Sequence, residues 1–500
     1  MIGVEKEYNR LSRLRLWILP VLILGLLFVA SCNTSQGPGD DTTGNIDIWI
    51  DSNGEVDNEE NGLKYRVSED GNSYEVCGFA QDSHPEVVIP ATLGGKPVTA
   101  ICPDAFRGNA TVRTVKIGEN VTKIGQNAFE GCTELVSVAI DGGAVAIKKE
   151  AFRECPKLRR FETKGSLDAI GEYAFYFCDA LEDFVVAENV GWVGSHAFEL
   201  CGALSAFRVP GNLERLSGNA FLYGGLRRFS VDGEISEICP GAFDGCSTLK
   251  YVKLGSALQK MPEDLFRDKA SVEIVILSPG CVLSEQMFVG CSALQQVELP
   301  TGIRAIPNRA FYGCGALSKI VIPEGVLEIG QYAFAECRRL ERVELPETLS
   351  KINAGAFKTC ERLTEIHFPE SLTVIQATAF QFSGLTEVTI PSGVACGQSA
   401  FADCTALERA VIGKNYLLPE GMFQRCSKLQ RVEIGEGVTV IPAGMFLHCK
   451  NLTEVLLPES LRIISVQAFL GCTLLSELKI PDGVTEIAEN AFEGSGIVLP

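Results

Sequence analysis

Residues 310–332 read AFYGCGALSKIVIPEGVLEIGQY, and the next copy of this pattern begins at Ala333. The phenylalanine of the pattern recurs every 21 to 23 residues, most often every 23. Its eighteen copies are Phe106, Phe129, Phe152, Phe175, Phe198, Phe221, Phe243, Phe266, Phe288, Phe311, Phe334, Phe357, Phe380, Phe401, Phe423, Phe446, Phe469 and Phe492. A period of this length is the signature of a solenoid, in which each repeat forms one coil.

The middle of the repeat predicts a short strand. Leu317, Ile320 and Ile322 are expected to point inward, with Lys319 and Val321 between them pointing outward. A proline follows directly, and proline ends a strand because it cannot donate a ladder hydrogen bond. One repeat cannot bury its apolar side chains alone, so stacked repeats share a continuous core.

The rest of the repeat predicts the return of the chain to the next coil. Val326 and Ile329 are expected to point back into the core, and Ala333 and Phe334 to begin a tight helical turn. Phe334 would then stack on the phenylalanines of neighbouring coils. The predicted fold is a leucine-rich-repeat-type solenoid: a right-handed superhelix with one parallel β-sheet of short strands and short helical or irregular return segments. Coils about 4.8 Å apart would give a strand face on the order of 80 Å long.

Cysteine occupies one fixed position of the repeat, three residues after the phenylalanine. We expect these side chains to be buried and reduced, because side chains in a ladder point the same way and an odd run cannot pair completely. One cysteine per coil also lacks the short spacings of a zinc site. The thirteen are Cys132, Cys155, Cys178, Cys201, Cys246, Cys291, Cys314, Cys337, Cys360, Cys404, Cys426, Cys449 and Cys472.

The unit A-F-x-x-C-x-x-L-x-x-[VI]-x-[IL]-P and the entry stretch IPATLGGKPVTAI at residues 89–101 resemble the BspA-like leucine-rich repeat surface proteins of host-associated anaerobes. The resemblance covers roughly residues 63–500. It implies a curved solenoid on the cell surface, with adhesion to host matrix proteins or to other bacteria in some members. It brings no catalytic residues.

The N-terminus predicts an exported lipoprotein. A basic segment precedes an apolar run at residues 16–30, which is short for a membrane span and suits a signal peptide. Val29-Ala30-Ser31-Cys32 resembles a bacterial lipobox, which implies a lipid on the Cys32 thiol and cleavage before it. The alternative is an ordinary cleaved signal with a chance cysteine. The expected location is the outer membrane, facing the cell surface.

Four segments are therefore predicted: a signal peptide at 1–31, a flexible acidic tether at 32–62, an N-terminal cap with the first repeat at 63–104, and the solenoid of about eighteen units at 105–500. Within the tether, acidic residues alternate at 51–57 as calcium ligands do, but Val56 stands where an EF-hand loop needs glycine. A solvated linker is the favoured interpretation of this stretch.

The composition and motifs argue against several function classes. A net charge of −19 argues against nucleic acid as a partner, because phosphates need Lys and Arg. Four histidines in separate repeats predict no metal cluster. Nucleophile-elbow and phosphate-loop motifs are missing from the sequence, so we expect no enzyme and no cofactor.

One repeat breaks the polar pattern of the outward strand positions. Ile274 and Ile276 are expected to point outward, with Tyr251 on the preceding strand and Lys253 and Glu298 at the rim. An apolar patch rimmed by charge is a common mark of an interaction site. The alternatives are that an irregular turn shifts the register and makes these isoleucines core, or that a local loop covers them.

The sequence thus predicts a binding or adhesion module for a protein or glycan ligand of unknown identity, attached to the membrane only through its lipid. The first alternative is a structural or assembly partner within the envelope. The second is an unrecognised hydrolase, since a carboxylate pair can hide among many surface acids.

Overall fold

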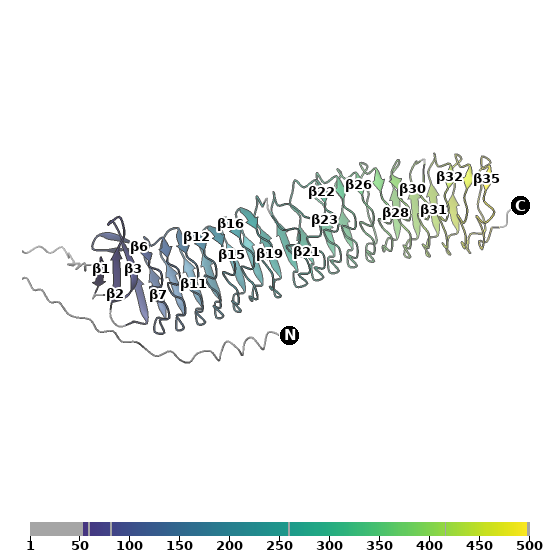
Figure 1. The fold of residues 1–500 in the computed structure, drawn as a ribbon. Coiled ribbons are helices and arrows are strands. Elements are labelled where there is room, and N and C mark those ends of the chain that lie inside the picture. Colours follow the sequence, from purple (N-terminus) through teal and green to yellow (C-terminus); the bar gives the residue numbers. More distant parts are fainter. Residues whose placement is uncertain (1–53, 59–60, 81–82, 259–260, 416, 498–500) are drawn as a thin grey trace, which may run out of the picture. The chain divides into compact units, whose positions relative to one another are not determined.

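The computed structural model describes residues 54–58, 61–80, 83–258, 261–415 and 417–497, and Cys32 lies outside them. The described residues form one row of stacked coils, with one coil for each of the eighteen phenylalanines (Figure 1). The predicted fold class is confirmed. Each coil has three sides: a strand, a return segment, and a turn around the phenylalanine.

The first side of the coils forms parallel ladders that we call the main face. Within each strand, buried and exposed residues alternate, as in Glu387–Ile390, because successive side chains point to opposite sides of a sheet. The strands are β4 (Glu86–Ile89), β7 (Thr114–Ile117), β9 (Ser137–Ile140), β11 (Arg160–Thr163), β13 (Asp183–Val186), β15 (Ala206–Val209), β17 (Arg228–Val231), β19 (Tyr251–Leu254), β20 (Ile274–Leu277), β21 (Gln296–Glu298), β23 (Lys319–Val321), β25 (Arg342–Glu344), β28 (Glu387–Ile390), β30 (Arg409–Ile412), β31 (Arg431–Ile434) and β33 (Glu454–Leu456).

The return segments form a second set of parallel ladders, which corrects the prediction of a single sheet. Coils in register bring the backbones of successive return segments within hydrogen-bonding distance, so even two-residue stretches pair. These strands are β6 (Lys96–Ile101), β8 (Lys123–Ile124), β10 (Val145–Ile147), β12 (Leu167–Ile170), β14 (Val190–Val193), β16 (Leu213–Leu216), β18 (Ile235–Ile238), β22 (Ala305–Ile306), β24 (Glu328–Ile329), β26 (Lys351–Ile352), β27 (Val374–Ile375), β29 (Ala395–Cys396), β32 (Val440–Ile441), β34 (Ile463–Ile464) and β35 (Glu486–Ile487).

The third side, which we call the turn edge, runs from two residues before each phenylalanine to two residues after it. The expected helical turn is wrong: no helix occurs within the described ranges, and the turn edge is built of hydrogen-bonded turns. Tyr332 and Glu336 flank the Phe334 turn with φ values of 53° and 60°, in the left-handed region that an α-helix does not visit. The Phe334 amide instead donates to the Ala356 carbonyl of the next coil at 2.8 Å.

The phenylalanines stack through the core as predicted. Phe334 is fully buried. Its ring centroid lies 5.1 Å from that of Phe311 and 5.3 Å from that of Phe357, with the rings nearly parallel. The same stacking recurs from coil to coil, so the apolar core is continuous along the row.

The thirteen repeat cysteines are buried free thiols, as predicted. Each is tied to the backbone of the preceding coil: Cys337 Sγ–H, for example, donates to the Phe311 carbonyl at 3.2 Å. Burial raises the pKa of the Cys337 thiol to about 12. A repeat cysteine therefore acts as a small apolar side chain that also satisfies a core carbonyl.

The cap begins the row with antiparallel pairing. Strand β1 (Glu55–Asn58) pairs with β2 (Leu63–Val67), and β2 pairs with β3 (Tyr74–Phe79), before β3 joins β6 in parallel. The two-residue strand β5 (Thr92–Leu93) pairs antiparallel with β6. Strand β1 falls inside the segment predicted as a tether, and Glu55 forms an ion pair with Lys64. The other predicted segment boundaries stay predictions.

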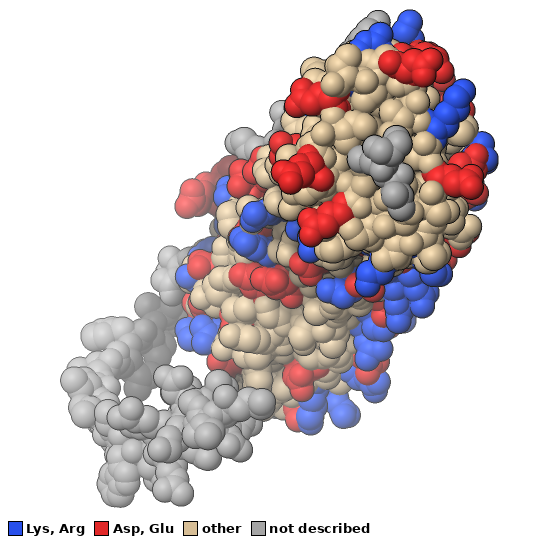
Figure 2. All heavy atoms as spheres, turned by 90° about the vertical axis from the view of Figure 1, so that its right-hand side faces the viewer, with Lys and Arg blue, Asp and Glu red and all other residues tan. Residues whose placement is uncertain are grey.

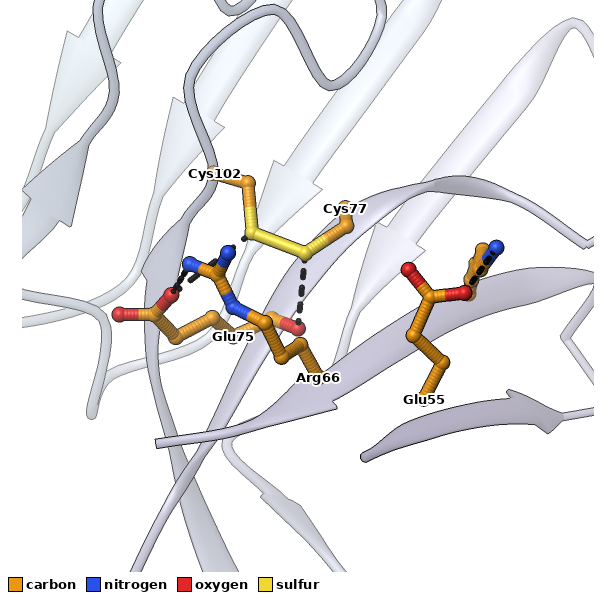
Figure 3. Close-up of a disulfide and its surroundings, with 6 residues drawn as sticks. Glu55, Arg66, Glu75, Cys77 and Cys102 are labelled. Atoms are coloured by element: carbon orange, nitrogen blue, oxygen red, sulfur yellow. Dashed lines mark hydrogen bonds and ion pairs between the residues drawn. A yellow bond between two sulfur atoms is a disulfide. The ribbon is translucent and has the colours of Figure 1, made fainter. Parts of the chain in front are cut away.

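A disulfide that the sequence analysis missed fastens the cap to the first coil. It joins Cys77 of β3 to Cys102, which follows β6, with a Cα–Cα distance of 4.9 Å (Figure 3). Beside it, Arg66 of β2 forms an ion pair with Glu75 of β3. Both cysteines stand outside the repeat position, but so do the free Cys239, Cys281 and Cys396, so this feature alone does not mark the pair.

Candidate functional site

The structure places Tyr251, Ile274 and Ile276 together on the outer surface of the main face; we call these three residues the sheet patch. Strands β19 and β20 run parallel and in register, so that Tyr251 lies beside Ile274, and Lys253 lies beside Ile276. All three patch side chains are half-buried. The patch thus spans two adjacent strands, as the sequence predicted.

The core residues of β20 fix which way the isoleucines point. Val272 and Val275 are fully buried and Leu277 is 3% exposed, so the intervening Ile274 and Ile276 lie on the opposite side of the strand. This excludes the alternative in which a shifted register makes both isoleucines core. In the same coil Lys269 stands in place of the repeat cysteine, and its ammonium group pairs with Asp244 at 3.0 Å without displacing the strand.

Basic side chains border the sheet patch on the side of β17. The Arg228 guanidinium carbon lies 4.5 Å from the centre of the Tyr251 ring, a cation–π contact that holds the ring in place. Lys253 Nζ lies 2.7 Å from Asp232, which also binds Arg208 at 2.8 Å. Lys253 and, secondarily, Arg208 lower the pKa of Asp232. The predicted Lys253 rim is therefore an ion-pair cluster of two cations on one carboxylate, which leaves one net positive charge.

On the side of β21, the sheet patch is bordered by polar side chains, and an apolar side chain follows on the next strand. Gln296 lies beside Ile274, and Glu298 lies beside Ile276, on strand β21. On β23, the next strand of the main face, Val321 is 55% exposed. An apolar ligand surface centred on the two isoleucines would therefore meet one amide and one carboxylate at this border.

Metal-ligating groups and thiols are two kinds of reactive side chain that can be followed in the described residues. They contain no group of three or more His, Cys, Asp or Glu side chains that could hold a metal ion. Burial raises the pKa of the Cys132 and Cys404 thiols to about 12, which keeps them protonated at neutral pH and poor as nucleophiles. His196 Nδ1 lies 2.6 Å from Glu199 within one turn.

Charges of both signs are spread over the surface. Viewed toward the C-terminal end of the row, Lys and Arg side chains lie among Asp and Glu side chains (Figure 2). Ion pairs between neighbouring coils are frequent among the described residues, such as Arg338 with Glu361 at 2.7 Å. In the part of the chain that the structure describes, no helix is long and apolar enough to cross a membrane.

The repeat geometry agrees with a family comparison. The family described as "BspA type Leucine rich repeat region (6 copies)" matches residues 99–227, 219–340, 281–408, 327–452 and 397–498. The chain belongs to the BspA-type leucine-rich repeat family. No curated protein matches it.

Several solved structures are similar to this BspA-type chain. A leucine-rich repeat protein from Bacteroides ovatus is 22% identical, with 87% of this chain and 91% of that chain covered and a TM-score of 0.35. A leucine-rich repeat protein of T. pallidum is 30% identical over 40% of this chain and 77% of its own, with a TM-score of 0.28. A leucine-rich cell surface protein from Faecalibacterium prausnitzii is 22% identical, covering 87% and 95%, with a TM-score of 0.25.

Proposed function

We propose that this BspA-type chain is a non-catalytic binding module of the cell surface that recognises a protein partner through the sheet patch. The observation that carries the proposal is the outward position of Ile274 and Ile276 beside Tyr251. The part of these half-buried side chains that faces water costs free energy that burial against a partner recovers, at about 25 cal/mol per Å² of apolar area.

A protein suits this patch better than a glycan does. Two β-branched side chains offer apolar area and no hydrogen bonds, and Tyr251 presents a ring held by Arg228. Aromatic and arginine side chains are common anchors of protein interfaces, surrounded by contacts that exclude water. The Lys253–Asp232 pair and Glu298 would then form the polar rim.

The proposed test is the double substitution Tyr251→Ala with Ile274→Ser. The purified chain is immobilised through its N-terminus so that the sheet patch stays accessible. It is exposed to matrix proteins and to envelope extracts, and captured proteins are identified by mass spectrometry. We expect capture to be lost, because the variant removes the apolar centre of the interface. Folding should be nearly unchanged, because both side chains lie outside the core.

A matched control is Val185→Ser, which removes another exposed apolar residue of the main face, 47% exposed on β13. A partner of the sheet patch is captured by the wild type and by this control but not by the double variant. Equal capture by all three proteins would sink the proposal. Capture only from envelope extracts, and not from matrix proteins, would assign the partner to the same envelope.

We further propose that Cys32 carries the lipid that attaches the chain to the outer membrane, with the solenoid facing outward. The support is the sequence Val29-Ala30-Ser31-Cys32. Immunolabelling of unpermeabilised cells with an antibody to residues 54–497 tests the orientation. Labelling only after permeabilisation would place the solenoid on the inner side.

A further inference from the structure

A hollow of about 350 Å³ lies on the turn edge of four successive coils, away from the main face. Its wall is formed by Arg267, Gln286, Val289, Arg309, Tyr312 and Tyr332. Small-molecule sites have volumes of roughly 300–1,000 Å³, so the hollow has the size of a site for one small ligand unit. The residues come from the same repeat positions, either two before or one after the stacked phenylalanine.

Small residues create the hollow. The two positions after Phe288 are Val289 and Gly290, and Gly313 holds the corresponding place in the next coil. Gly290 and Gly313 have φ values of 75° and 74°, in a region where glycine is favoured. Larger side chains stand on either side of this gap, which is why the surface is concave here.

The two arginines of the hollow have no acidic partner. Within the described part of the chain, neither Arg267 nor Arg309 has a carboxylate within ion-pair distance, although ion pairs between coils are frequent elsewhere. Two carboxylates on these coils are engaged by neutral donors: Asn308 donates to Glu285 at 2.8 Å, and the Tyr312 hydroxyl donates to Glu336. The guanidinium groups are therefore left with their charge and donors available.

One guanidinium is held in position. The Arg309 guanidinium carbon lies 5.7 Å from the centre of the Tyr332 ring, and this ring lies against Gly355, where any side chain would collide with it. Arg267 enters the hollow from two coils away. A planar guanidinium that is oriented in this way can bind both oxygens of a carboxylate.

We propose that this turn-edge hollow binds a saccharide that carries a carboxylate. The guanidinium groups of Arg267 and Arg309 bind the carboxylate, Gln286 supplies both a donor and an acceptor for hydroxyl groups, and the half-buried Tyr312 offers apolar ring surface to the sugar carbons. An extended acidic peptide is less well suited, because a hollow of about 350 Å³ has the size of a site for one small ligand unit. The site is independent of the sheet patch.

The test is isothermal titration of the full chain with two matched pairs of probes: sialyllactose against its methyl ester, and digalacturonate against its methyl ester. Each pair keeps the sugar skeleton and differs in the carboxylate. We expect at least one acidic probe to bind, and its neutral counterpart to bind roughly tenfold more weakly or not at all, because a charge-assisted hydrogen bond is lost. Affinity should also fall as salt concentration rises.

Variants locate the site. Arg267→Ala and Arg309→Ala should each weaken the binding of the acidic probe roughly tenfold, and Arg309→Lys should restore only part of it because the bidentate geometry is missing. Arg339→Ala, which removes an exposed guanidinium outside the hollow, should bind like the wild type. Thermal unfolding checks that all variants fold, as expected for exposed side chains.

Three outcomes overturn the proposal. The first is that neither acidic probe binds. The second is that acidic and neutral probes bind equally, or that the hollow variants bind as the wild type does. The third is that a tetraglutamate peptide binds more tightly than either acidic saccharide, which would assign the hollow to acidic peptides instead.

Discussion

Phe334 links three coils through one residue. Its ring packs between Phe311 and Phe357, and its amide donates to the Ala356 carbonyl of the following coil at 2.8 Å. Its own carbonyl accepts the Cys360 thiol of that coil at 3.2 Å. Ring stacking, backbone pairing and a thiol hydrogen bond therefore converge on the most regular position of the repeat.

We expect Phe334→Ala to destabilise the middle of the row by about 3–5 kcal/mol, because it leaves a cavity in a close-packed core. Since coils contact only their neighbours, the loss should be local at first. Compared with the wild type, the variant should show faster hydrogen exchange in β23 and β25, and unchanged exchange in the distant β7 and β9. The control Tyr223→Ala, at a ring that is 65% exposed, should change stability by less than about 1 kcal/mol. Equal effects of both variants would contradict the assigned register.

A second prediction at the residue scale concerns Cys32. Cys32→Ala should leave the chain without lipid, and therefore released from the membrane fraction or unprocessed, because acylation needs the thiol. Mass spectrometry of the mature N-terminus checks this. The control Cys281→Ala removes a buried thiol and should leave acylation intact. An unmodified N-terminus beyond residue 32 in the wild type would disprove the lipid anchor.

At the scale of elements, the strands of the main face could be predicted, whereas the strands of the return segments and the non-helical form of the turn edge could not. Ile320 and Ile322 alternate with the outward Lys319 and Val321, and in most repeats the outward positions are polar because one side of the strand meets water. Strand β24 has only two residues, Glu328 and Ile329, too few for any periodicity. It exists because equal coil lengths bring neighbouring return segments into register.

The turn edge was mispredicted for a different reason. Ala-Phe sequences favour a helix locally, but residues on both sides of the pair adopt left-handed φ values. Some coils place glycine there, as at Gly313, whereas others place Tyr332 or Glu336, which carry no such signal. The outward position of the sheet patch could be predicted from alternation, but the turn-edge hollow could not, because its residues converge only when coils stack.

A further prediction at the scale of elements concerns the stability of the cap. Reduction of the Cys77–Cys102 disulfide, or Cys77→Ser, should destabilise the cap by about 3 kcal/mol, because the bond closes a loop of sequence separation 25. Hydrogen exchange should then increase in β2, β3 and β6, while β30 and β31 at the other end serve as an internal control. Unchanged exchange in the cap after reduction would show that antiparallel pairing alone holds these strands.

At the scale of the whole molecule, the row of buried thiols makes the free energy of unfolding fall as the pH becomes alkaline. Burial raises the pKa of Cys337, Cys404 and Cys472 to about 12, from the ordinary value of 9.0. It also raises the pKa of Cys314 and Cys360 well above that value. Between the ordinary and the raised pKa, the unfolded chain has lost these protons and the folded chain has kept them.

Raising the pH through this window therefore favours the unfolded chain, and stability present below pH 9 is lost progressively up to about pH 12. Each buried thiol that unfolds contributes a loss of about 1.4 kcal/mol per pH unit. Denaturant unfolding with a reductant present, compared at about pH 8 and pH 10, measures the effect, to which Tyr65 also contributes because burial raises its pKa to about 12.

The variant with Cys314, Cys337 and Cys360 replaced by alanine isolates the thiol contribution. It should be less stable than the wild type at about pH 8, because three hydrogen bonds to core carbonyls are lost. Its further loss on going to about pH 10 should nevertheless be smaller, by about 1.4 kcal/mol for each missing thiol in the unfolding unit, since alanine cannot ionise. If wild type and variant lose the same stability over this range, the row of thiols does not titrate on unfolding. Other ionisable groups then cause the loss of stability at alkaline pH.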